Sequence, residues 1–143
     1  MILKPTEIQV VTWREAEDNL RAIRTPVFIV EQNVTDEFEW DDLDATAIHL
    51  LAMVNQQAVG CARVIGNKIG RMAVLKVCRG KGIGMELLKK SLEIIKNKGA
   101  ASAYLSAQTH AIGFYQQAGF TVISGEYCDV HIPHVDMEYQ FVK

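Results

Sequence analysis

The hydrophobic pattern of the first thirty residues predicts one strand followed by helix. Residues 8–13, "IQVVTW", form a short apolar run with β-branched residues, which is typical of a strand. Residues 12–15, "TWRE", match a capping box in which Thr12 caps a helix and Glu15 reaches back to its start. Apolar residues then recur every three or four positions, as in a helix with one buried face. They are Ala16, Leu20, Ile23 and Val27.

A proline interrupts this helical pattern. Pro26 suits the first turn of a helix but not its interior, because proline lacks the N–H donor and clashes with the preceding turn. We therefore expect two consecutive helical segments that break near Arg24. Residues 35–44, "TDEFEWDDLD", carry six acidic residues without a clean period and are predicted to form a loop.

Three apolar segments in mid-chain predict a meander of antiparallel strands. Residues 47–54, 58–66 and 68–77 are apolar, and the turn sequences "NQQ" and "GN" separate them. Residues 82–98 then place apolar side chains on one helical face and Lys and Glu on the other. This segment is predicted to be a helix that ends at Gly99.

The remaining segments complete an α+β pattern. Residues 102–107 are predicted to form a short strand, 109–119 a helix, and 120–132 and 135–142 the closing strands. The order β-α-α-β-β-β-α-β-α-β-β indicates a mixed sheet with helices packed on it.

Composition limits the class of protein. The chain has 143 residues, 49% hydrophobic and 22% charged, so a single domain spanning 1–143 is expected. A formal net charge of −2 argues against a nucleic-acid partner. No apolar run approaches the ~20 residues that cross a bilayer, so we expect no membrane partner and a cytoplasmic location. Cys61, Cys78 and Cys128 are predicted to be reduced thiols, because they are odd in number and far apart.

Residues 79–84, "RGKGIG", form a glycine loop between a predicted strand and a predicted helix. Such a loop places backbone N–H groups at the positive end of the helix dipole, where anions bind, and Arg79 and Lys81 add charge. An ordinary strand-to-helix turn is the alternative interpretation. A Walker A loop needs Ser or Thr after Gly80-Lys81, and the dinucleotide motif needs a third glycine at a spacing that is absent here.

Two segments together resemble the GNAT superfamily of acetyl-CoA-dependent N-acetyltransferases. They are Arg79-x-x-Gly82-x-Gly84 after the strand "GRMAVLKV", and "AIGFYQQAGF" some thirty residues later. The segments "RTPVFIVEQNV", "HLLA" and "IPHVDME", with Asp44, are similar to the ElaA/YjcF-like branch of that superfamily. Lys76 and Ser106 depart from the family pattern, and the serine stands where an asparagine that can bind the coenzyme is common.

The resemblance implies a GNAT-like fold, with a mostly antiparallel sheet of about six to seven strands and helices on both faces. It implies acetyl-CoA as co-substrate and direct transfer of the acetyl group to a primary amine of a small molecule, peptide or protein. The pantetheine arm would enter a splay between strands 71–77 and 102–106, and a main-chain N–H near Ala73 or Val74 would stabilise the oxyanion. The implied coenzyme-binding residues are Ala73, Val74, Leu75, Arg79, Gly80, Lys81, Gly82, Ile83, Gly84 and Tyr115.

The resemblance implies that Tyr115 faces the coenzyme sulphur, where it would act as a general acid. The alternative is a tyrosine that only packs in the core. A base is also needed, because an alkylamine with a pKa near 10.4, the ordinary lysine value, is protonated at neutral pH. Glu31, His49 and His134 are the candidates, with His134 slightly preferred. Each has a structural alternative: Glu31 as a cap or hydrogen-bonding residue, and either histidine as a packed residue.

Several further interpretations remain open from the sequence. Cys128-x-x-His131-x-x-His134 contains zinc ligand types, but residues three apart on a strand point to opposite faces, so no metal is expected. The acidic residues of 36–44 either attract a cationic amine or form a solvated loop, and Trp40 either lines the acceptor pocket or anchors this loop. A catalytically silent acyl-CoA sensor is the alternative function. The last strand is a candidate for pairing in a homodimer.

Overall fold

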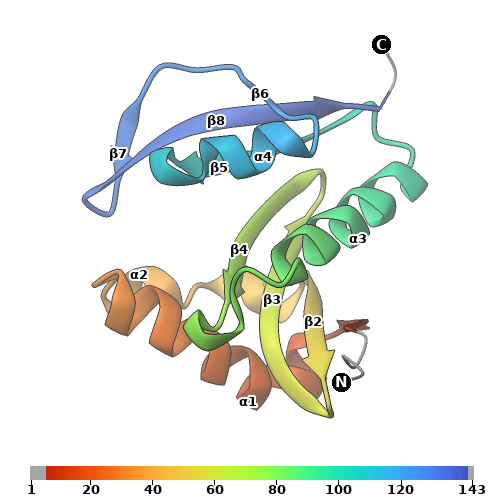
Figure 1. Ribbon diagram of the computed structural model, residues 1–143, viewed down its shortest axis with the longest axis vertical. Coiled ribbons are helices and arrows are strands. Elements are labelled where there is room, and N and C mark those ends of the chain that lie inside the picture. Colours follow the sequence, from red (N-terminus) through yellow and green to blue (C-terminus); the bar gives the residue numbers. More distant parts are fainter. Residues whose placement is uncertain (1–5, 142–143) are drawn as a thin grey trace.

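One mixed sheet of eight strands organises the molecule (Figure 1). The computed structural model describes residues 6–141. The strands run in the order β1-β2-β3-β4-β5-β8-β6, and β7 also pairs with β8. Their bounds are β1 Glu7–Val11, β2 Ile48–Val54, β3 Gln57–Ile65, β4 Lys68–Val74, β5 Ser102–Gln108, β6 Thr121–Val122, β7 Tyr127–Asp129 and β8 Ile132–Gln140. The predicted mixed, mostly antiparallel sheet is therefore confirmed, with one strand more than the largest number expected.

The helical segments are short except for two. The α-helices are α1 Trp13–Arg24, α2 Asp36–Glu39, α3 Ile83–Asn97 and α4 Ile112–Gln117. A π-helical segment, η1 Thr25–Glu31, follows α1, and single 3-10 turns are η2 Asp42–Ala45, η3 Lys76–Cys78 and η4 Thr109–Ala111. No described helix has the length and apolar character that crossing a membrane requires.

The first helix begins as its sequence predicts. The Thr12 hydroxyl oxygen accepts a hydrogen bond from the Glu15 backbone N–H at 3.1 Å, and the Glu15 carboxylate accepts one from the Thr12 N–H at 3.0 Å. The capping box is thus confirmed. The predicted break near Arg24 is also confirmed, because the chain changes there to the wider η1, with Pro26 in its first turn.

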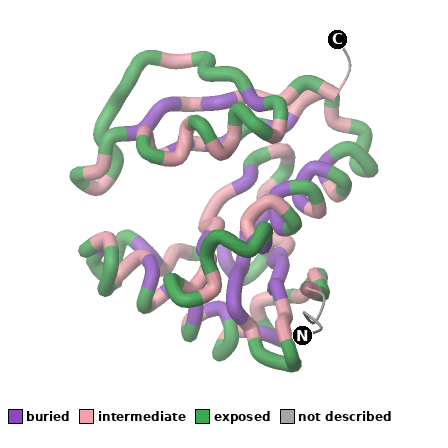
Figure 2. Tube along the Cα trace, in the orientation of Figure 1, coloured by how far each residue is buried: buried purple, intermediate pink, exposed green. Residues whose placement is uncertain are grey.

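Helices cover both faces of the sheet. The buried residues of α1 and η1 pack on one face against Leu51, Cys61 and Ala73. On the other face α3 and α4 pack against the core that includes Leu50, Ala52 and Ala62. Figure 2 shows the buried backbone concentrated in the strands and the inner sides of α1 and α3.

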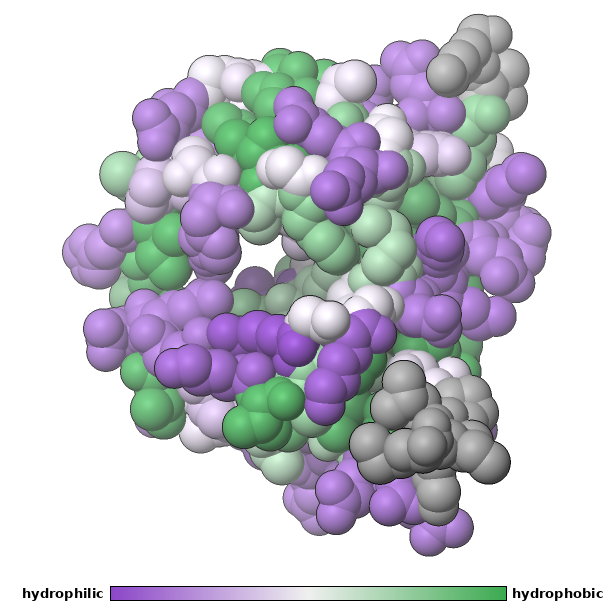
Figure 3. Space-filling view, in the orientation of Figure 1, coloured by the Kyte–Doolittle hydropathy of each residue, from purple (hydrophilic) through white to green (hydrophobic). Residues whose placement is uncertain are grey.

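The sheet splays between β4 and β5, the only parallel pair within residues 6–141. These strands pair at Lys68 with Tyr104 and at Ile69 with Leu105, and pairing stops there. A β-bulge then bends β4 at Arg71, whose φ of 47° is left-handed. The expected splay is therefore present. Figure 3 shows the surface hollowed between the β2–β4 half of the molecule and the half that contains β5, α4 and β8.

Four sequence-based expectations need correction. The predicted strand 68–77 ends at Val74 and is followed by η3, and the predicted strand 120–132 is two short strands, β6 and β7. Residues 35–44 are not a plain loop: α2 and η2 lie within or next to them, and Glu39 and Asp44 are buried. They are helical because buried arginines hold both carboxylates, as described below. The last strand, β8, is not an open edge, because β5 lies on one side and β6 and β7 lie on the other. Val142, predicted to end this strand, lies outside the described residues.

Candidate active site

The glycine loop, residues 79–84, presents backbone rather than side chains. Gly80 and Gly82 have φ values of 79° and 84°, and a Cβ on either would face open space. Gly82 begins α3 without a side-chain cap, so the N–H groups of its first turn point outward without a capping side chain. Ile83 turns its side chain into the core. The local geometry is that of an anion site at a helix N-terminus.

Gly84 brings the loop against α4. A Cβ at this position would lie 3.3 Å from Cζ of Phe114, the residue before Tyr115. That distance is tighter than most Cβ contacts, so a larger residue at 84 would require the Phe114 ring to shift by a few tenths of an ångström.

Arg79 does not extend freely into solvent. Its Nε donates to the Val74 carbonyl oxygen at 2.9 Å, and its two terminal nitrogens bind the Glu31 carboxylate at 2.7 and 2.8 Å. The hydrogen bond from Arg79 lowers the pKa of Glu31. Arg79 therefore links η1 to the end of β4, whereas Lys81 is exposed.

The backbone N–H and C=O groups of β4 point alternately towards β3 and towards the splay. The Leu75 N–H donates to the Val59 carbonyl at 2.9 Å, so residue 75 is committed to β3. In an antiparallel pair successive residues point their N–H and C=O groups in opposite directions, so Val74 points both groups away from β3 and towards the splay. Ala73 contributes a buried side chain on the α1 face. Among the three predicted pantetheine contacts, Val74 thus has the exposed main chain.

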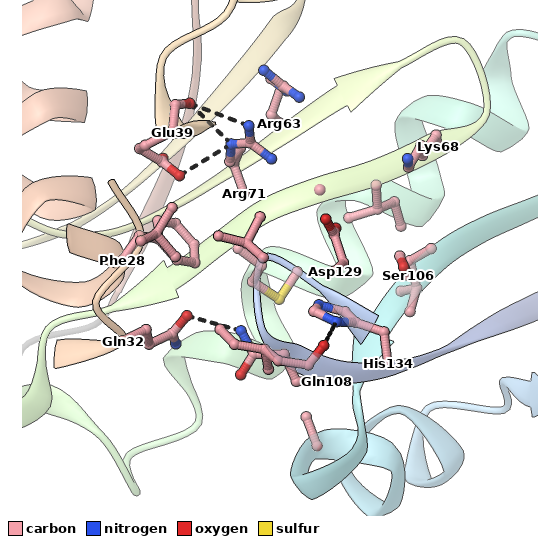
Figure 4. A pocket seen from close by; sticks show the side chains of 18 of the residues that line it. Phe28, Gln32, Glu39, Arg63, Lys68, Arg71, Ser106, Gln108, Asp129 and His134 are labelled. Carbon is pink, nitrogen blue, oxygen red and sulfur yellow. Dashed lines mark hydrogen bonds and ion pairs between the residues drawn. The ribbon is translucent and has the colours of Figure 1, made fainter. Parts of the chain in front are cut away.

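A cavity of about 260 Å³ lies beside the splay (Figure 4). Its walls come from η1, α2, β3, β4, β5, η4, α4 and the β7–β8 hairpin. Its polar lining residues are Gln32, Glu39, Arg63, Lys68, Arg71, Ser106, Gln108, His110, Tyr115, Asp129 and His134. Gln108 donates to Gln32 at 2.8 Å and so joins β5 to η1 across one side of the cavity.

Tyr115 lines this cavity from α4. Its ring packs edge-to-face on Phe114 and Phe120, with centroids 5.1 and 5.9 Å away. Burial raises the pKa of Tyr115 to about 12, so the hydroxyl keeps its proton at neutral pH. The side chain combines the two properties expected at sequence level: it packs in the core and also reaches the cavity.

The three candidate bases occupy different environments. His134 lines the cavity, and its Nδ1 lies 2.7 Å from the Ile132 carbonyl oxygen. Because a carbonyl only accepts, Nδ1 carries the hydrogen, and Nε2 of the neutral ring carries a free lone pair. His49 is buried, donates Nε2–H to the Asp44 carbonyl at 2.8 Å, and has its pKa lowered by burial. Neither His49 nor Glu31 lines the cavity.

The Cys128, His131 and His134 series spans the β7–β8 hairpin. Cys128 is exposed in β7, His131 is at the turn with a φ of 69°, and His134 is in β8. Within residues 6–141 no group of three or more His, Cys, Asp or Glu side chains is arranged to hold a metal ion.

A charged cluster beneath the cavity was not anticipated from the sequence. Its members are Arg24, Glu39, Asp41, Asp44, Arg63 and Arg71. Arg24 binds Glu39 at 2.6 Å and Asp44 at 2.8 Å, and all three are nearly inaccessible to solvent. Burial raises the pKa of Glu39, although Arg24 and Arg71 act to lower it. For Asp44, burial is outweighed by hydrogen bonds from Arg24 and Arg63, and the pKa is lowered.

This cluster fixes the wall of the cavity. Arg63, Arg71 and Glu39 belong to both the cluster and the lining, and Figure 4 shows Glu39 and Arg71 joined at its edge. Arg71 also binds the carbonyl oxygens of Phe38 and Glu39 at 3.2 Å, which explains how a strand residue is held in a left-handed conformation. One sequence signal was available: Arg24 and Arg63 stand inside apolar segments, and buried cations need acidic partners.

Known proteins share this fold and sequence. The model of the acetyltransferase (GNAT) domain family matches residues 16–141. Protein YyaT of Bacillus subtilis (strain 168) is 42% identical over 122 residues, covering 80% of this chain and 82% of YyaT. The N-acetyltransferase YjcF of the same strain is 35% identical over 120 residues, covering 80% of this chain and 86% of YjcF.

The fold agrees with these sequence relationships. The crystal structure of Escherichia coli ElaA superposes with a TM-score of 0.85 at 29% identity, covering 95% of this chain and 100% of that chain. The splayed sheet, the glycine loop and the family match therefore lead to one conclusion: the chain belongs to the GNAT acetyltransferase family, with ElaA and YjcF among its relatives, and is an acyltransferase.

Proposed function

We propose that this protein transfers the acetyl group of acetyl-CoA directly to a primary amine bound in the cavity. The observation that carries the proposal is the course of the β4–β5 splay. The splay has Val74 on its β4 side, the glycine loop follows β4, and the cavity that contains Tyr115 and His134 lines the same opening. A coenzyme with a long arm and a charged end fits that path.

The loop suits the pyrophosphate of the coenzyme. Gly80 and Gly82 leave open space in front of the uncapped first turn of α3, so backbone N–H groups can approach phosphate oxygens. Lys81 adds a positive charge, and Arg79 adds another once it leaves Glu31. The Val74 C=O then pairs with the pantetheine arm, after Arg79 has released it, and the Val74 N–H remains for the thioester.

The coenzyme supplies a thioester, and residues of the chain handle charge and protons around it. The amine nitrogen attacks the thioester carbonyl, a C–N bond forms and the C–S bond breaks. The Val74 N–H donates a hydrogen bond to the carbonyl oxygen as negative charge develops there. Tyr115, whose phenol is protonated at neutral pH, gives its proton to the leaving sulphur.

The base in this proposal is His134. Its Nε2 lone pair is free because Nδ1–H is fixed by the Ile132 carbonyl, and its ring lines the cavity. It accepts the proton that the amine must lose. Glu31 and His49 are poorer candidates. Arg79 binds the Glu31 carboxylate, and His49 is buried with its Nε2–H bound to the Asp44 carbonyl.

Calorimetric titration with acetyl-CoA tests the coenzyme half of the proposal. We expect binding by the wild type and its loss when Arg79→Ala is combined with Gly82→Asp. The control is Gly66→Asp, which puts the same side chain on another glycine of positive φ, 59°, in open space at the β3–β4 turn. Equal binding of acetyl-CoA by the wild type and the double variant would exclude the glycine loop as the coenzyme-binding site.

Mass spectrometry of reaction mixtures tests the transfer half. The probes are an alkylamine, an α-amino acid, an aminosugar and a lysine-containing peptide, each with acetyl-CoA. We expect a mass increase of one acetyl group on at least one probe. Coenzyme binding without transfer to any of them would instead support the silent acyl-CoA sensor.

A further inference from the structure

Ser106 occupies the position at which the two halves of the sheet separate. The last paired residue of β5 is Leu105, opposite Ile69, so Ser106 is the first β5 residue beyond the pairing. It also lines the cavity (Figure 4). Tyr115 is another lining residue. A side chain at position 106 lies at the narrow end of the splay and faces the cavity in which the acceptor is proposed to bind.

A chain of hydrogen bonds gives the Ser106 hydroxyl a fixed direction. The Tyr127 hydroxyl donates to Asp136 at 2.5 Å, because a carboxylate only accepts. With its single hydrogen committed, the Tyr127 oxygen can only accept from its other neighbour, the Ser106 hydroxyl. The Ser106 hydrogen therefore points to Tyr127, and only the lone pairs of its oxygen remain for the cavity.

The three residues that fix the direction of these hydrogen bonds come from three strands. Ser106 is in β5, Tyr127 in β7 and Asp136 in β8, and Ser106 is directly opposite Asp136 in the β5–β8 register. The Tyr127 ring also stacks on His134, with centroids 6.1 Å apart and planes inclined by 21°. Burial first, and then the hydrogen bond to Asp136, raise the pKa of Tyr127. Asp129 of β7 adds to that effect, so the phenol keeps the proton on which the direction of the chain depends.

From this geometry we infer that Ser106 is the hydrogen-bond acceptor that holds the nucleophilic nitrogen of the acceptor, with Tyr127 and Asp136 as its positioning residues. The inference rests on the proposed acetyl transfer and specifies the chemistry of the acceptor subsite. A group with an N–H to donate satisfies the serine oxygen. A group that offers only lone pairs at that position is repelled by it. The nitrogen lone pair that remains is left for the thioester carbonyl.

Steady-state kinetics with the acetylated probe amine test this assignment. Ser106→Ala and Tyr127→Phe are each expected to raise the KM for the amine about tenfold, because one hydrogen bond to the acceptor is lost or misdirected. The same bond exists before and during the reaction, so kcat is expected to stay within about threefold. Ser106→Thr keeps the hydroxyl and is expected to restore a low KM.

The matched control is Tyr104→Phe, since Tyr104 and Tyr127 are equally exposed, at 37%, on the same sheet. It should leave all constants unchanged, and all variants should bind acetyl-CoA as the wild type does. If the wild type acetylates an amine and Tyr127→Phe has an unchanged KM, the inference is wrong and the proposed function stands. If the wild type binds acetyl-CoA but acetylates none of the probes, both are contradicted; failure to bind acetyl-CoA contradicts the proposed function at its first step.

Discussion

One side of the splay presents mainly backbone groups, and the other side presents mainly side chains. The coenzyme side consists of backbone: two glycines of positive φ, an uncapped helix start and one ion pair whose side chains are 40% and 34% exposed. The proposed acceptor side consists of side chains brought from nine elements of the described chain and supported by a buried charged cluster. The difference indicates a division of labour. In the proposed function, backbone binds the coenzyme and side chains select the acceptor.

The largest expected effect is on the acceptor side. Arg24→Met leaves Glu39 and Asp44 buried without their shared partner, and we expect the free energy of unfolding to fall by about 3–5 kcal/mol. Urea denaturation measures this. Lys90→Met removes an ion pair in α3 whose side chains are 34% and 59% exposed, and should cost at most about 1 kcal/mol. Equal losses in the two variants would contradict the structural role of the charged cluster.

The second effect separates chemistry from binding. Tyr115→Phe removes the proposed acid and keeps the packed ring, so kcat is expected to fall on the order of a hundredfold while the Kd for acetyl-CoA is unchanged. The control is Tyr139→Phe, in the same group of aromatic rings around Phe120. An undiminished kcat in Tyr115→Phe would remove this residue from the mechanism.

Tyr115 also predicts a pH dependence. Its pKa is about 12 in the folded protein and about 10 in the unfolded chain, so between these values the folded state retains a proton that the unfolded state has lost. The free energy of unfolding must therefore decrease as the pH rises through this window. The decrease between about pH 9 and about pH 11 should be smaller in Tyr115→Phe. Identical slopes would show that the phenol titrates normally.

A smaller effect distinguishes backbone strain from coenzyme recognition. Gly82→Ala and Gly66→Ala each force a residue of positive φ, in open space, to carry a Cβ, and each should cost about 1 kcal/mol of stability. Only the first should weaken acetyl-CoA binding, by about tenfold, because its Cβ occupies the space in front of α3. Calorimetry on both variants gives the comparison, and a matching loss of affinity at Gly66 would argue against a local role for the loop.

The smallest effect concerns the exposed ion pair. Glu31→Gln should change stability by less than about 1 kcal/mol, since exposed pairs contribute little. Because it frees Arg79 for phosphate, acetyl-CoA affinity should rise about twofold at low salt and converge with the wild type at high salt. A fall in affinity would show that Glu31 orients Arg79 for the coenzyme instead of competing for it.

The same division explains which parts of the structure the sequence predicted. Thr12, Pro26, Gly80 and Gly82 act within a few residues of their own position, so local patterns predicted the capping box, the helix break and the glycine loop. The strand meander followed from apolar runs and turns. These features depend on backbone conformation, which short segments of sequence determine.

The acceptor side depends on contacts between distant segments. Arg24 meets Glu39 and Asp44 across 15 and 20 residues, and Arg71 meets Glu39 across 32. Acidic residues 35–44 therefore resembled a solvated loop, because nothing nearby in sequence shows that arginines will bury two of them. Ser106 and Tyr127 are also 21 residues apart. Their pairing requires the β5–β8 register, which the pattern of apolar residues does not specify.

Gly84 joins the two sides in a way that affects how kinetic data are interpreted. It lies in the coenzyme loop, yet the atom it lacks would press on Phe114, whose neighbour is Tyr115. Loop variants are usually assigned to substrate affinity and helix variants to turnover. A residue larger than glycine at 84 would shift both constants together, although it touches neither the acceptor nor the phenolic oxygen. The proposed coenzyme loop and the helix of the proposed acid lie in close contact at Gly84 and Phe114, so an exchange of this loop between relatives should carry α4 with it.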